Sequence, residues 1–298
     1  MDARVRGRAV RLSNLRKAFW PELGIEKGDL LAYYADMAEV LLPHIEGRPM
    51  VMKRYPNGWR GEHFFMKRTP SHAPEWLETC SVEHGSGSII DFPVVRDTAG
   101  LLWLVNLGCI DLNPWYSTCD DTNRPDVLHF DLDPVPDAGF DAVRDSALRL
   151  RELLDELGMP SYPKTSGSRG IHVYVPIVRE PTQKEVWHVA KSLGLLMEER
   201  HPDLVTARYR IADRPPDRVL VDYNQNAWGR TLASVYSVRP REGAPVSAPL
   251  TWDEVEAGAE IGDFHLANMR QRIDAVGDLW RPMAWPRRGR ADLRPLIV

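Results

Sequence analysis

The stretch Leu128-His129-Phe130-Asp131-Leu132-Asp133-Pro134 decides how this chain is interpreted. Apolar and polar residues alternate in it, and a period of two predicts a β-strand over 127–133 that Pro134 closes. Asp131 and Asp133 then lie on one face, with Cα atoms about 6.6 Å apart, while Phe130 and Leu132 face the core. Two carboxylates this close repel each other, so we expect a hard divalent cation between them.

A third acid repeats the pattern, because Asp222 ends the apolar run Val219-Leu220-Val221. Three acids can hold two divalent metals, one that activates an attacking hydroxyl and one that binds the leaving phosphates. Acids at strand ends are also common caps and turn formers, and a lone Asp-x-Asp is a weak motif. The carboxylates alone therefore favour a structural role.

A glycine-rich loop moves the interpretation towards a phosphate ligand. It runs Lys164-Thr165-Ser166-Gly167-Ser168-Arg169-Gly170 and leads into a strand that carries His172. We expect its backbone N–H groups and hydroxyls to approach an anion, with Lys164 and Arg169 supplying charge. His172 is expected to donate to a triphosphate oxygen. The spacing is not that of a Walker loop, and an ordinary polar hairpin loop is the alternative.

Mixed strands and helices predict an α+β or α/β chain with a central sheet and helices outside. Apolar spacing predicts helices over 27–42, ended by Pro43 and Gly47, over 140–157 and over 182–200, the last with a Thr182–Glu185 capping box. Shorter helices are expected over 251–256 and 264–273. Strands are expected over 49–54, 62–67, 88–95, 171–176, 219–222 and 231–238, while 101–107 is ambiguous between helix and strand.

The net charge of −4 counts mildly against a nucleic-acid partner, but binding depends on local patches. The basic residues are clustered, although solvated faces are an equally good explanation of clusters. The clusters are Arg4, Arg6, Arg8, Arg11, Arg16 and Lys17; Lys53, Arg54, Arg60, Lys67 and Arg68; Arg208, Arg210, Arg214 and Arg218; and Arg287, Arg288, Arg290 and Arg294.

Cellular location is indicated by what the sequence lacks. Cys80, Cys109 and Cys119 have neither zinc-ligand spacing nor an even count, which fits reduced thiols. The arginine-rich start has no apolar signal core, and no stretch approaches the roughly 20 apolar residues of a membrane helix. We expect a cytoplasmic protein.

Four motifs in this order resemble the polymerase domain of bacterial DNA ligase D, of the archaeo-eukaryotic primase superfamily. They are Phe130-Asp131-Leu132-Asp133-Pro134, the loop from Thr165 to His172, Val221-Asp222-Tyr223 and Tyr236-Ser237-Val238-Arg239. The resemblance implies an α+β, primase-like fold with an RRM-like mixed sheet, flanking helices and a smaller N-terminal α/β subdomain. It implies one catalytic domain: 10–120 for DNA-end contacts, 121–256 as the metal and nucleotide core, and 257–298 as C-terminal helices and basic tail.

The resemblance also implies an activity. It is the addition of nucleotides, often ribonucleotides, to DNA 3′ ends in non-homologous end joining or gap filling, with two manganese or magnesium ions. Asp131, Asp133 and Asp222 match the catalytic metal ligands. Further positions match contacts to the nucleotide, namely Ser166, His172 and Arg239 at the triphosphate and Lys53 in the nucleotide site. Asn113 stands where the family commonly has a histidine near the sugar, and Gln225 where some members have an arginine.

Other positions match DNA contacts. Asn14, Lys17 and Lys27 match the pocket that binds the 5′-phosphate at a break or gap. Phe64 and Phe65 match an aromatic pair that stacks on the template. Adjacent phenylalanines in a strand usually place one ring in the core, so we expect at least one ring to be buried.

The partners implied are 5′-phosphorylated DNA, nucleoside triphosphates, the Ku end-binding protein and a separate ligase. Nothing resembles the ligase's nucleotidyl-lysine motif or its nuclease, and we expect a stand-alone, nucleoid-associated bacterial or archaeal relative rather than an excised domain. Two other functions stay open: a metal-dependent nuclease, and a non-catalytic DNA-end-binding module. Primase activity without a primer is a variant of the main interpretation.

Overall fold

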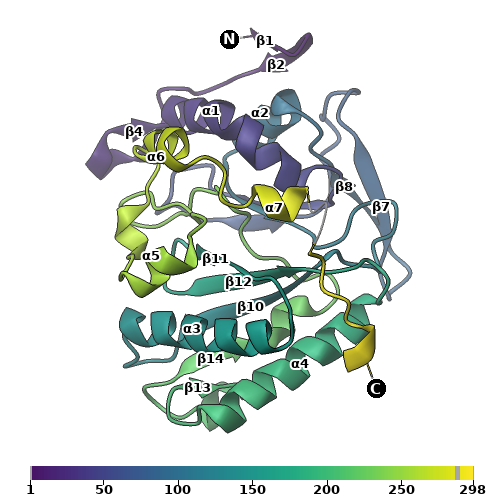
Figure 1. Cartoon of the computed structure of the whole chain (residues 1–298). Helices are drawn as coiled ribbons and strands as arrows, with labels where there is room; N and C mark the ends of the chain where they lie inside the picture. Colours follow the sequence, from purple (N-terminus) through teal and green to yellow (C-terminus); the bar gives the residue numbers. More distant parts are fainter. Residues whose placement is uncertain (1, 286–288, 298) are drawn as a thin grey trace. The chain divides into compact units, whose positions relative to one another are not determined.

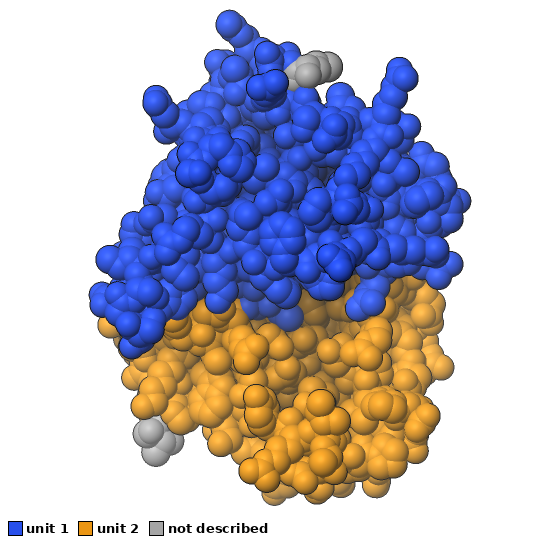
Figure 2. All heavy atoms as spheres, turned by 180° about the vertical axis from the view of Figure 1, so that it is seen from behind, with its two compact units in different colours: residues 1–122, 231–247, 264–277 blue, residues 123–230, 248–263, 278–298 orange. Residues whose placement is uncertain are grey.

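The computed structural model describes residues 2–285 and 289–297, which form two compact units (Figure 2). Unit 1 comprises residues 1–122, 231–247 and 264–277, and unit 2 comprises 123–230, 248–263 and 278–298. The division expected near residue 120 lies beside the first crossing of the chain into unit 2. The segments 231–247 and 264–277 then return to unit 1.

Unit 2 is built on a five-stranded sheet in the order β11-β12-β10-β14-β13. The central strand β10 (Val127–Pro134) pairs antiparallel with β12 (Ile171–Pro176) and with β14 (Val219–Asp222). Beyond β12 lies β11 (Tyr162–Thr165), and β13 (Val205–Thr206) pairs parallel with β14. Without β13, the chain order β-α-β-β-α-β and the strand order 2-3-1-4 are those of an RRM-like sheet, so this prediction is confirmed.

Two helices, α3 (Phe140–Glu156) and α4 (Gln183–Arg200), lie along one side of this sheet (Figure 1). Both contact β10 and β14, and α3 buries an apolar stripe that includes Leu150 and Leu154. The predicted capping box is present at the start of α4. Phe130 and Leu132 are fully buried, and because strand side chains alternate, Asp131 and Asp133 lie on the opposite face.

Short elements complete unit 2. The helix α5 (Trp252–Glu256) lies within the range 251–256 where a helix was predicted, and it begins one residue later because Thr251 is its N-cap, in a capping box with Glu254. The helix α7 (Arg281–Ala284) lies near the end of the chain. The 3₁₀ turns are η2 (Ile211–Asp213), η3 (Tyr223–Asn226), η4 (Ile261–Asp263) and η5 (Arg294–Leu296).

Unit 1 has a three-stranded antiparallel sheet in the order β6-β5-β9. Its strands are β6 (Phe64–Met66), β5 (Met50–Arg54) and β9 (Cys109–Pro114). The helices α1 (Lys27–Ile45) and α2 (Thr98–Asn106) pack together, and α6 (Met269–Val276) and the turn η1 (Pro21–Leu23) complete the helical part.

Three two-stranded ribbons belong to unit 1, and only β8 among their strands was predicted. They are β1 (Asp2–Val5) with β2 (Arg8–Arg11), β3 (Ala18–Trp20) with β4 (Ile25–Glu26), and β7 (Thr79–Glu83) with β8 (Ile89–Pro93). A cluster of buried side chains that includes Val51, Phe92 and Trp115 joins the last ribbon to the sheet. The cysteines are free, as expected. No helix in the described part of the chain is both long and apolar enough to span a membrane.

Several sequence-based boundaries are wrong. Pro43 lies inside α1, because its missing N–H removes one hydrogen bond near the end while Glu46 N still donates to Leu42 O at 2.9 Å. Residues 101–106 of the ambiguous stretch belong to helix α2, which Asp97 caps at its start, and Leu107 is the C-cap residue. The helix expected over 264–273 begins only at Met269, since Val246 N donates to the Phe264 carbonyl instead.

The strand expected over 231–238 is also wrong. Of its residues only Val238 forms a β-bridge, to Val246, and Tyr236 has a positive φ of 63°. Ser237 N donates to Ser234 O at 3.1 Å, which closes a turn. The apolar side chains here are buried, but the backbone is irregular and its polar groups pair individually rather than in a β-ladder. A run of buried apolar residues therefore had the sequence pattern of a strand without forming one.

The close approach of the glycine loop to β10 yields a stability prediction. A Cβ atom on Gly170 would lie 2.1 Å from the Leu132 carbonyl oxygen, in the second half of the central strand. Gly170→Ala should therefore destabilise the protein by about 1–3 kcal/mol, the usual effect of overpacking. Chemical denaturation followed by circular dichroism measures it. Gly262→Ala is the control, because nothing lies within 4 Å of its Cβ position; equal stability of both variants would contradict the prediction.

Candidate functional site

The three predicted acids of unit 2 meet in the sheet. Asp131 on β10 is directly opposite Asp222 on β14, and Asp133 follows two residues later on the same strand. On its other side Asp131 is opposite His172 of β12, which in turn is opposite Lys164 of β11. Asp222, Asp131, His172 and Lys164 thus form one transverse row over four strands, called the polar row below.

Contacts within the polar row fix the orientation of its histidine. His172 Nε2 lies 3.2 Å from Asp131 Oδ1, and His172 Nδ1 lies 2.8 Å from Lys164 Nζ. Lys164 is fully buried, with the Tyr174 ring 5.7 Å from its ammonium group. An ammonium group can only donate, so Nδ1 accepts from Lys164 and the ring proton sits on Nε2, facing Asp131. Lys164, expected in the phosphate loop, instead orients His172.

Whether these acids suit a metal follows from their chemistry and spacing. Like charges directly opposite each other on neighbouring strands are destabilising, and oxygen ligands are those that Mg²⁺ and Mn²⁺ prefer. Asp131 and Asp222 satisfy both conditions, and Asp133 shares their face. No ready-made group of three His, Cys, Asp or Glu side chains for a metal ion is found among residues 2–285 and 289–297. The donor set fits a hard cation, and the metal role stays a prediction.

Asp222 also has a local structural role. Its Oδ1 accepts from Asn224 N at 2.9 Å and caps η3, and its Oδ2 accepts from Gln225 Nε2 at 2.9 Å. Gln225, noted for replacing an arginine of some relatives, therefore positions the Asp222 carboxylate. The capping alternative raised by the sequence describes this acid as well as the metal alternative does.

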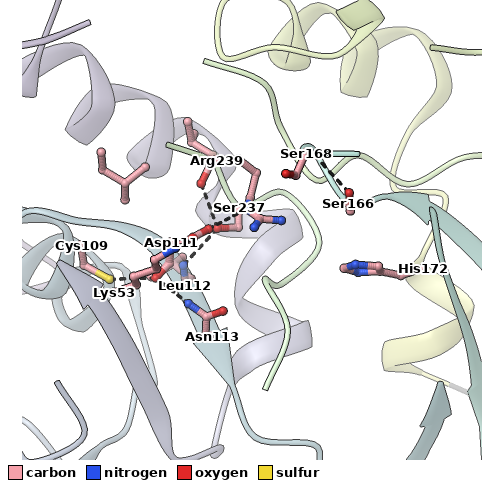
Figure 3. A network of polar contacts seen from close by, with 12 residues as sticks. Lys53, Cys109, Asp111, Leu112, Asn113, Ser166, Ser168, His172, Ser237 and Arg239 are labelled. Atoms are coloured by element: carbon pink, nitrogen blue, oxygen red, sulfur yellow. Dashed lines mark hydrogen bonds and ion pairs between the residues drawn. The ribbon is translucent and has the colours of Figure 1, made fainter. Parts of the chain in front are cut away.

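The glycine loop is folded around its own serine. Ser166 Oγ accepts from the backbone N–H group of Ser168 at 3.2 Å (Figure 3). It also accepts from the N–H groups of Arg169 at 3.2 Å and of Gly170 at 2.9 Å. The hydroxyl oxygen thus takes the place expected for an anion. Thr165 is fully buried and its Oγ1 accepts from Ala248 N at 3.0 Å, so its side chain faces the protein interior. Arg169 is the exposed cation of the loop.

The predicted nucleotide residues of unit 1 surround an acid that the sequence interpretation missed. Asp111 on β9 is 1% exposed, with Arg239 Nε 2.7 Å from its Oδ1 and Lys53 Nζ 3.6 Å from its Oδ2 (Figure 3). Burial lowers the pKa of Lys53; Asp111 opposes this shift, and Arg239 and Arg241 add to it. The signal for Asp111 was present, because Asp111 and Asn113 have the same spacing of two as Asp131 and Asp133.

Asn113 is held beside this cluster. It is opposite Val51 on β5, and its Nδ2 donates to the Asp111 carbonyl at 3.1 Å. Ser237 Oγ, next but one to Arg239 in the chain, accepts from Leu112 N at 3.0 Å and ties that segment to β9. The structure therefore brings Lys53, Asn113 and Arg239 together.

The three residues predicted to bind a 5′-phosphate share one cavity of about 250 Å³, called the phosphate pocket below. Lys17 Nζ donates to Asn57 Oδ1 at 2.7 Å, and Lys27 Nζ donates to Ser13 O at 2.7 Å and to Asn106 Oδ1 at 2.9 Å. Asn14 lines the cavity with a positive φ of 55°. Burial, Lys17 and Arg54 lower the pKa of Lys27 to about 8. Arg54 also lines the pocket and was not assigned to it from the sequence.

Phe64 and Phe65 contradict the expectation of a buried ring. They are 44% and 61% exposed, because β6 is a three-residue edge strand. Each ring covers a cation of β5: Arg54 lies 5.1 Å from Phe64, and Lys53 lies 5.6 Å from Phe65. Neighbouring strand residues face opposite sides, so one ring borders the phosphate pocket and the other borders the Asp111 cluster.

Two basic clusters serve the structure of unit 2. Arg208 donates to Asp213 O at 3.0 Å and Arg214 donates to the carbonyls of Arg208 and Tyr209, all in one loop, while Arg218 donates to Pro202 O at 3.0 Å, before β13. Arg290 donates to Ile177 O at 2.9 Å, and Arg294 pairs with Asp292 and Glu180. Arg287 and Arg288 lie outside the described residues.

Comparisons with known proteins place these geometries in context. A family model described as LigD, primase-polymerase domain, matches residues 26–280. The multifunctional non-homologous end joining protein LigD of Mycolicibacterium smegmatis is 34% identical over 276 residues, which are 92% of this chain and 36% of that protein. The bifunctional non-homologous end joining protein LigD of Bacillus subtilis is 32% identical over 269 residues, 90% of this chain and 43% of that protein.

A solved structure of a ligase D polymerase domain matches the fold of this chain. The polymerase domain from Mycobacterium tuberculosis ligase D, in complex with DNA, matches with a TM-score of 0.85 and 30% identity, covering 92% of this chain and 98% of that one. The chain spans 36–43% of the length of the two curated relatives described above.

The contact between Lys164 and His172 predicts a single imidazole tautomer. In the unmodified protein, heteronuclear NMR of ¹⁵N-labelled histidine should show His172 protonated at Nε2 and not at Nδ1. Lys164→Met removes the donor to Nδ1 and should give a mixture of tautomers. Lys184→Met, at an exposed lysine, is the control and should leave the His172 signals unchanged. A His172 ring protonated at Nδ1 in the unmodified protein would contradict the assignment.

The low basicity of Lys27 predicts pH-dependent anion binding. A lysine with a pKa of about 8 is charged below that pH and loses its proton as the pH rises through it. Affinity for a 5′-phosphorylated oligonucleotide should therefore fall between pH 7 and 9, by about tenfold if one charge–phosphate contact of roughly 1.4 kcal/mol is lost. Fluorescence anisotropy measures it. Lys27→Arg, which stays charged, should flatten the profile; an unchanged profile in this variant would assign the dependence elsewhere.

Proposed function

Because this chain belongs to the LigD primase-polymerase domain family, we propose that it is a nucleotidyltransferase that adds nucleotides to 3′ ends at 5′-phosphorylated DNA breaks or gaps. The observation that supports the proposal most is the polar row, in which two acids stand opposite each other beside an oriented histidine. This combination suits an enzyme that acts on phosphate esters, because the acids can hold cations where negative charge develops.

The proposed reaction is an in-line displacement. The oxygen of the primer 3′-hydroxyl attacks the α-phosphorus of a nucleoside triphosphate, a new P–O bond forms, the bond to the β-phosphate breaks, and pyrophosphate leaves. The hydroxyl proton passes to solvent. Two divalent cations, manganese or magnesium, would supply a lowered hydroxyl pKa and charge neutralisation on the phosphates.

Residues of unit 2 would do the following work in this reaction. Asp131, Asp133 and Asp222 would hold the cations through carboxylate oxygens. His172 would donate its Nε2 proton to a phosphate oxygen in place of Asp131, which would then hold a cation, because Lys164 occupies Nδ1. Ser166 would contribute mainly by fixing the loop, as three backbone N–H groups bind its hydroxyl, and Arg169 would supply the loop's charge.

Residues of unit 1 would bind phosphates and DNA. Lys53 and Arg239 would contact the nucleotide phosphates. The Asp111 carboxylate would hold these two basic side chains in place before the nucleotide binds. Asn113 keeps a carbonyl oxygen that can accept from a sugar hydroxyl. The phosphate pocket would bind the 5′-phosphate, and the exposed rings of Phe64 and Phe65 would stack on template bases, each worth roughly 1–3 kcal/mol regardless of sequence.

The proposed setting is non-homologous end joining, as the names of the relatives indicate. Extension of a 3′ end leaves a nick or gap that must be sealed, so a ligase, in another domain or another protein, would act next. Ku would bring the ends together. Whether ribose or deoxyribose is added would depend on Asn113 and its neighbours.

Loss of one acid of the polar row tests the activity. Asp131→Asn keeps size and hydrogen bonding but removes the charge, so primer extension on a gapped, 5′-phosphorylated duplex should fall by at least about 100-fold, or some 2.7 kcal/mol. DNA binding, measured by anisotropy, should stay within about twofold because phosphate contacts come from the basic residues. Extension is measured with each nucleotide type and with Mn²⁺ or Mg²⁺.

Asp203→Asn is the matched control, since this carboxylate is fully exposed and pairs only at 3.6 Å with Arg218. It should extend normally. Near-normal extension by Asp131→Asn would rule out the metal assignment. Shortening of the labelled primer by the unmodified protein would support a nuclease, and binding without either change would support a non-catalytic end-binding module.

A further inference from the structure

The first strands of the chain form a compact arginine-rich hairpin in unit 1 (Figure 1). β1 and β2 pair in register from Asp2 opposite Arg11 to Val5 opposite Arg8. The loop consists of Arg6 and Gly7, whose φ values of 50° and 80° are both positive. This is the two-residue turn geometry that tightens a hairpin and keeps its two strands in a fixed relation.

The two faces of the hairpin differ in chemistry. One face is packed: Val10 is buried, and Arg8 lies 3.0 Å from Asp97 and over the Trp76 ring at 5.1 Å. The other face carries Arg4, Ala9 and Arg11, all exposed, with Arg6 at the tip and Asp2 opposite Arg11. Within the described chain, no ion-pair partner engages Arg4, Arg6 or Arg11, in contrast to Arg8.

The exposed face leads directly into the phosphate pocket. The Asn106 side chain links the two: its Nδ2 donates to the Arg11 carbonyl at 3.0 Å, and its Oδ1 accepts from Ser13 N at 2.9 Å and from Lys27 Nζ at 2.9 Å. Ser13, Asn106 and Lys27 all line the pocket. A single half-buried amide therefore sets the position of the hairpin relative to the cation that would bind a 5′-phosphate.

We propose that the exposed face of the β1–β2 hairpin binds the phosphate backbone of the duplex that extends downstream from the bound 5′-phosphate. Arg11, Arg4 and Arg6 follow one another away from the pocket at intervals of about 7 Å, from the strand rise and the cross-strand spacing. Four residues of strand span roughly 14 Å, or about four base-pair steps of 3.4 Å. The three exposed arginines favour a polyanion as the ligand of this face. Duplex DNA is the polyanion proposed, because the face continues into the pocket that would bind the 5′-phosphate of the same DNA.

This inference rests on the proposed function only for the identity of the DNA end. The energetic argument is general: duplex DNA carries one charge per about 1.7 Å of its axis, and arginines that neutralise phosphates release bound counterions. Each contact contributes about 0.9 to the slope of log affinity against log salt concentration. Three arginines on a rigid ribbon would therefore leave a measurable signature.

The test compares salt slopes. The variant Arg4→Gln, Arg6→Asn, Arg11→Gln removes the three charges, and asparagine at position 6 tolerates the positive φ. Anisotropy with a 5′-phosphorylated recessed duplex should show a slope reduced by up to about 2.7, whereas a single-stranded 5′-phosphorylated oligonucleotide should show almost no change in slope. Both are measured in KCl without nucleotide, so the result does not depend on catalysis.

A second triple variant controls for net charge. Arg149→Gln, Arg200→Gln, Arg270→Gln removes three charges that pair with Glu152, Glu156 and Asp274 on helix surfaces, and it should leave both slopes unchanged. The proposal is overturned if the hairpin variant keeps the full salt slope on duplex DNA, or if its salt slope falls equally on duplex and single-stranded DNA. It is also overturned if the helix variant shows as large a fall in the duplex slope as the hairpin variant. Absence of any 5′-phosphate preference in the unmodified protein would instead contradict the proposed end recognition.

Discussion

The electrostatics of the polar row constrain the rest of unit 2. Asp222, Asp131, His172 and Lys164 stand at one level of four adjacent strands, two anions at one end and a cation at the other. A fully buried ammonium group costs several kcal/mol unless partners compensate it, and two opposed carboxylates repel. His172 couples the two halves, because its ring contacts both Lys164 and Asp131. Each member of the row therefore depends on its neighbour.

The sheet must keep this register, and its apolar face ensures that it does. Phe130 and Leu132 alternate with the acids and face α3 and α4. A slip of β10 by one residue would move the carboxylates onto the helix-covered face and the apolar pair onto the polar one. Gly170 adds a steric constraint, since only a residue without Cβ fits against the Leu132 carbonyl. Packing on one face thus determines the chemistry on the other.

The sequence predicted what is local and periodic. β12 and β14 have the expected bounds, β10 differs from expectation by Pro134 alone, and the capping box of α4 is present. The sequence did not predict contacts between distant segments. The pairing of Asp131 with Asp222 was suggested only by the similar patterns around the two acids. Asp111 was missed, although Asp111 and Asn113 have the same spacing as Asp131 and Asp133. The Ser166 hydroxyl can accept from the same N–H groups that an external anion would use. The composition of the loop does not predict which acceptor these N–H groups bind.

In unit 1 the alternation of side chains along a strand places two neighbouring cations in different surroundings. Lys53 and Arg54 are neighbours on β5, yet Lys53 contacts Asp111 and Phe65 while Arg54 lines the phosphate pocket beside Phe64. In the pocket, Arg54 and Lys17 help to lower the pKa of Lys27, so cations that repel one another are held together by the fold. A bound anion would relieve that repulsion as well as adding its own attraction, so it would be held more tightly there than beside an isolated surface lysine. Local concentration of this kind is how a chain with a net charge of −4 can still present a cavity lined by three cations, Lys17, Lys27 and Arg54.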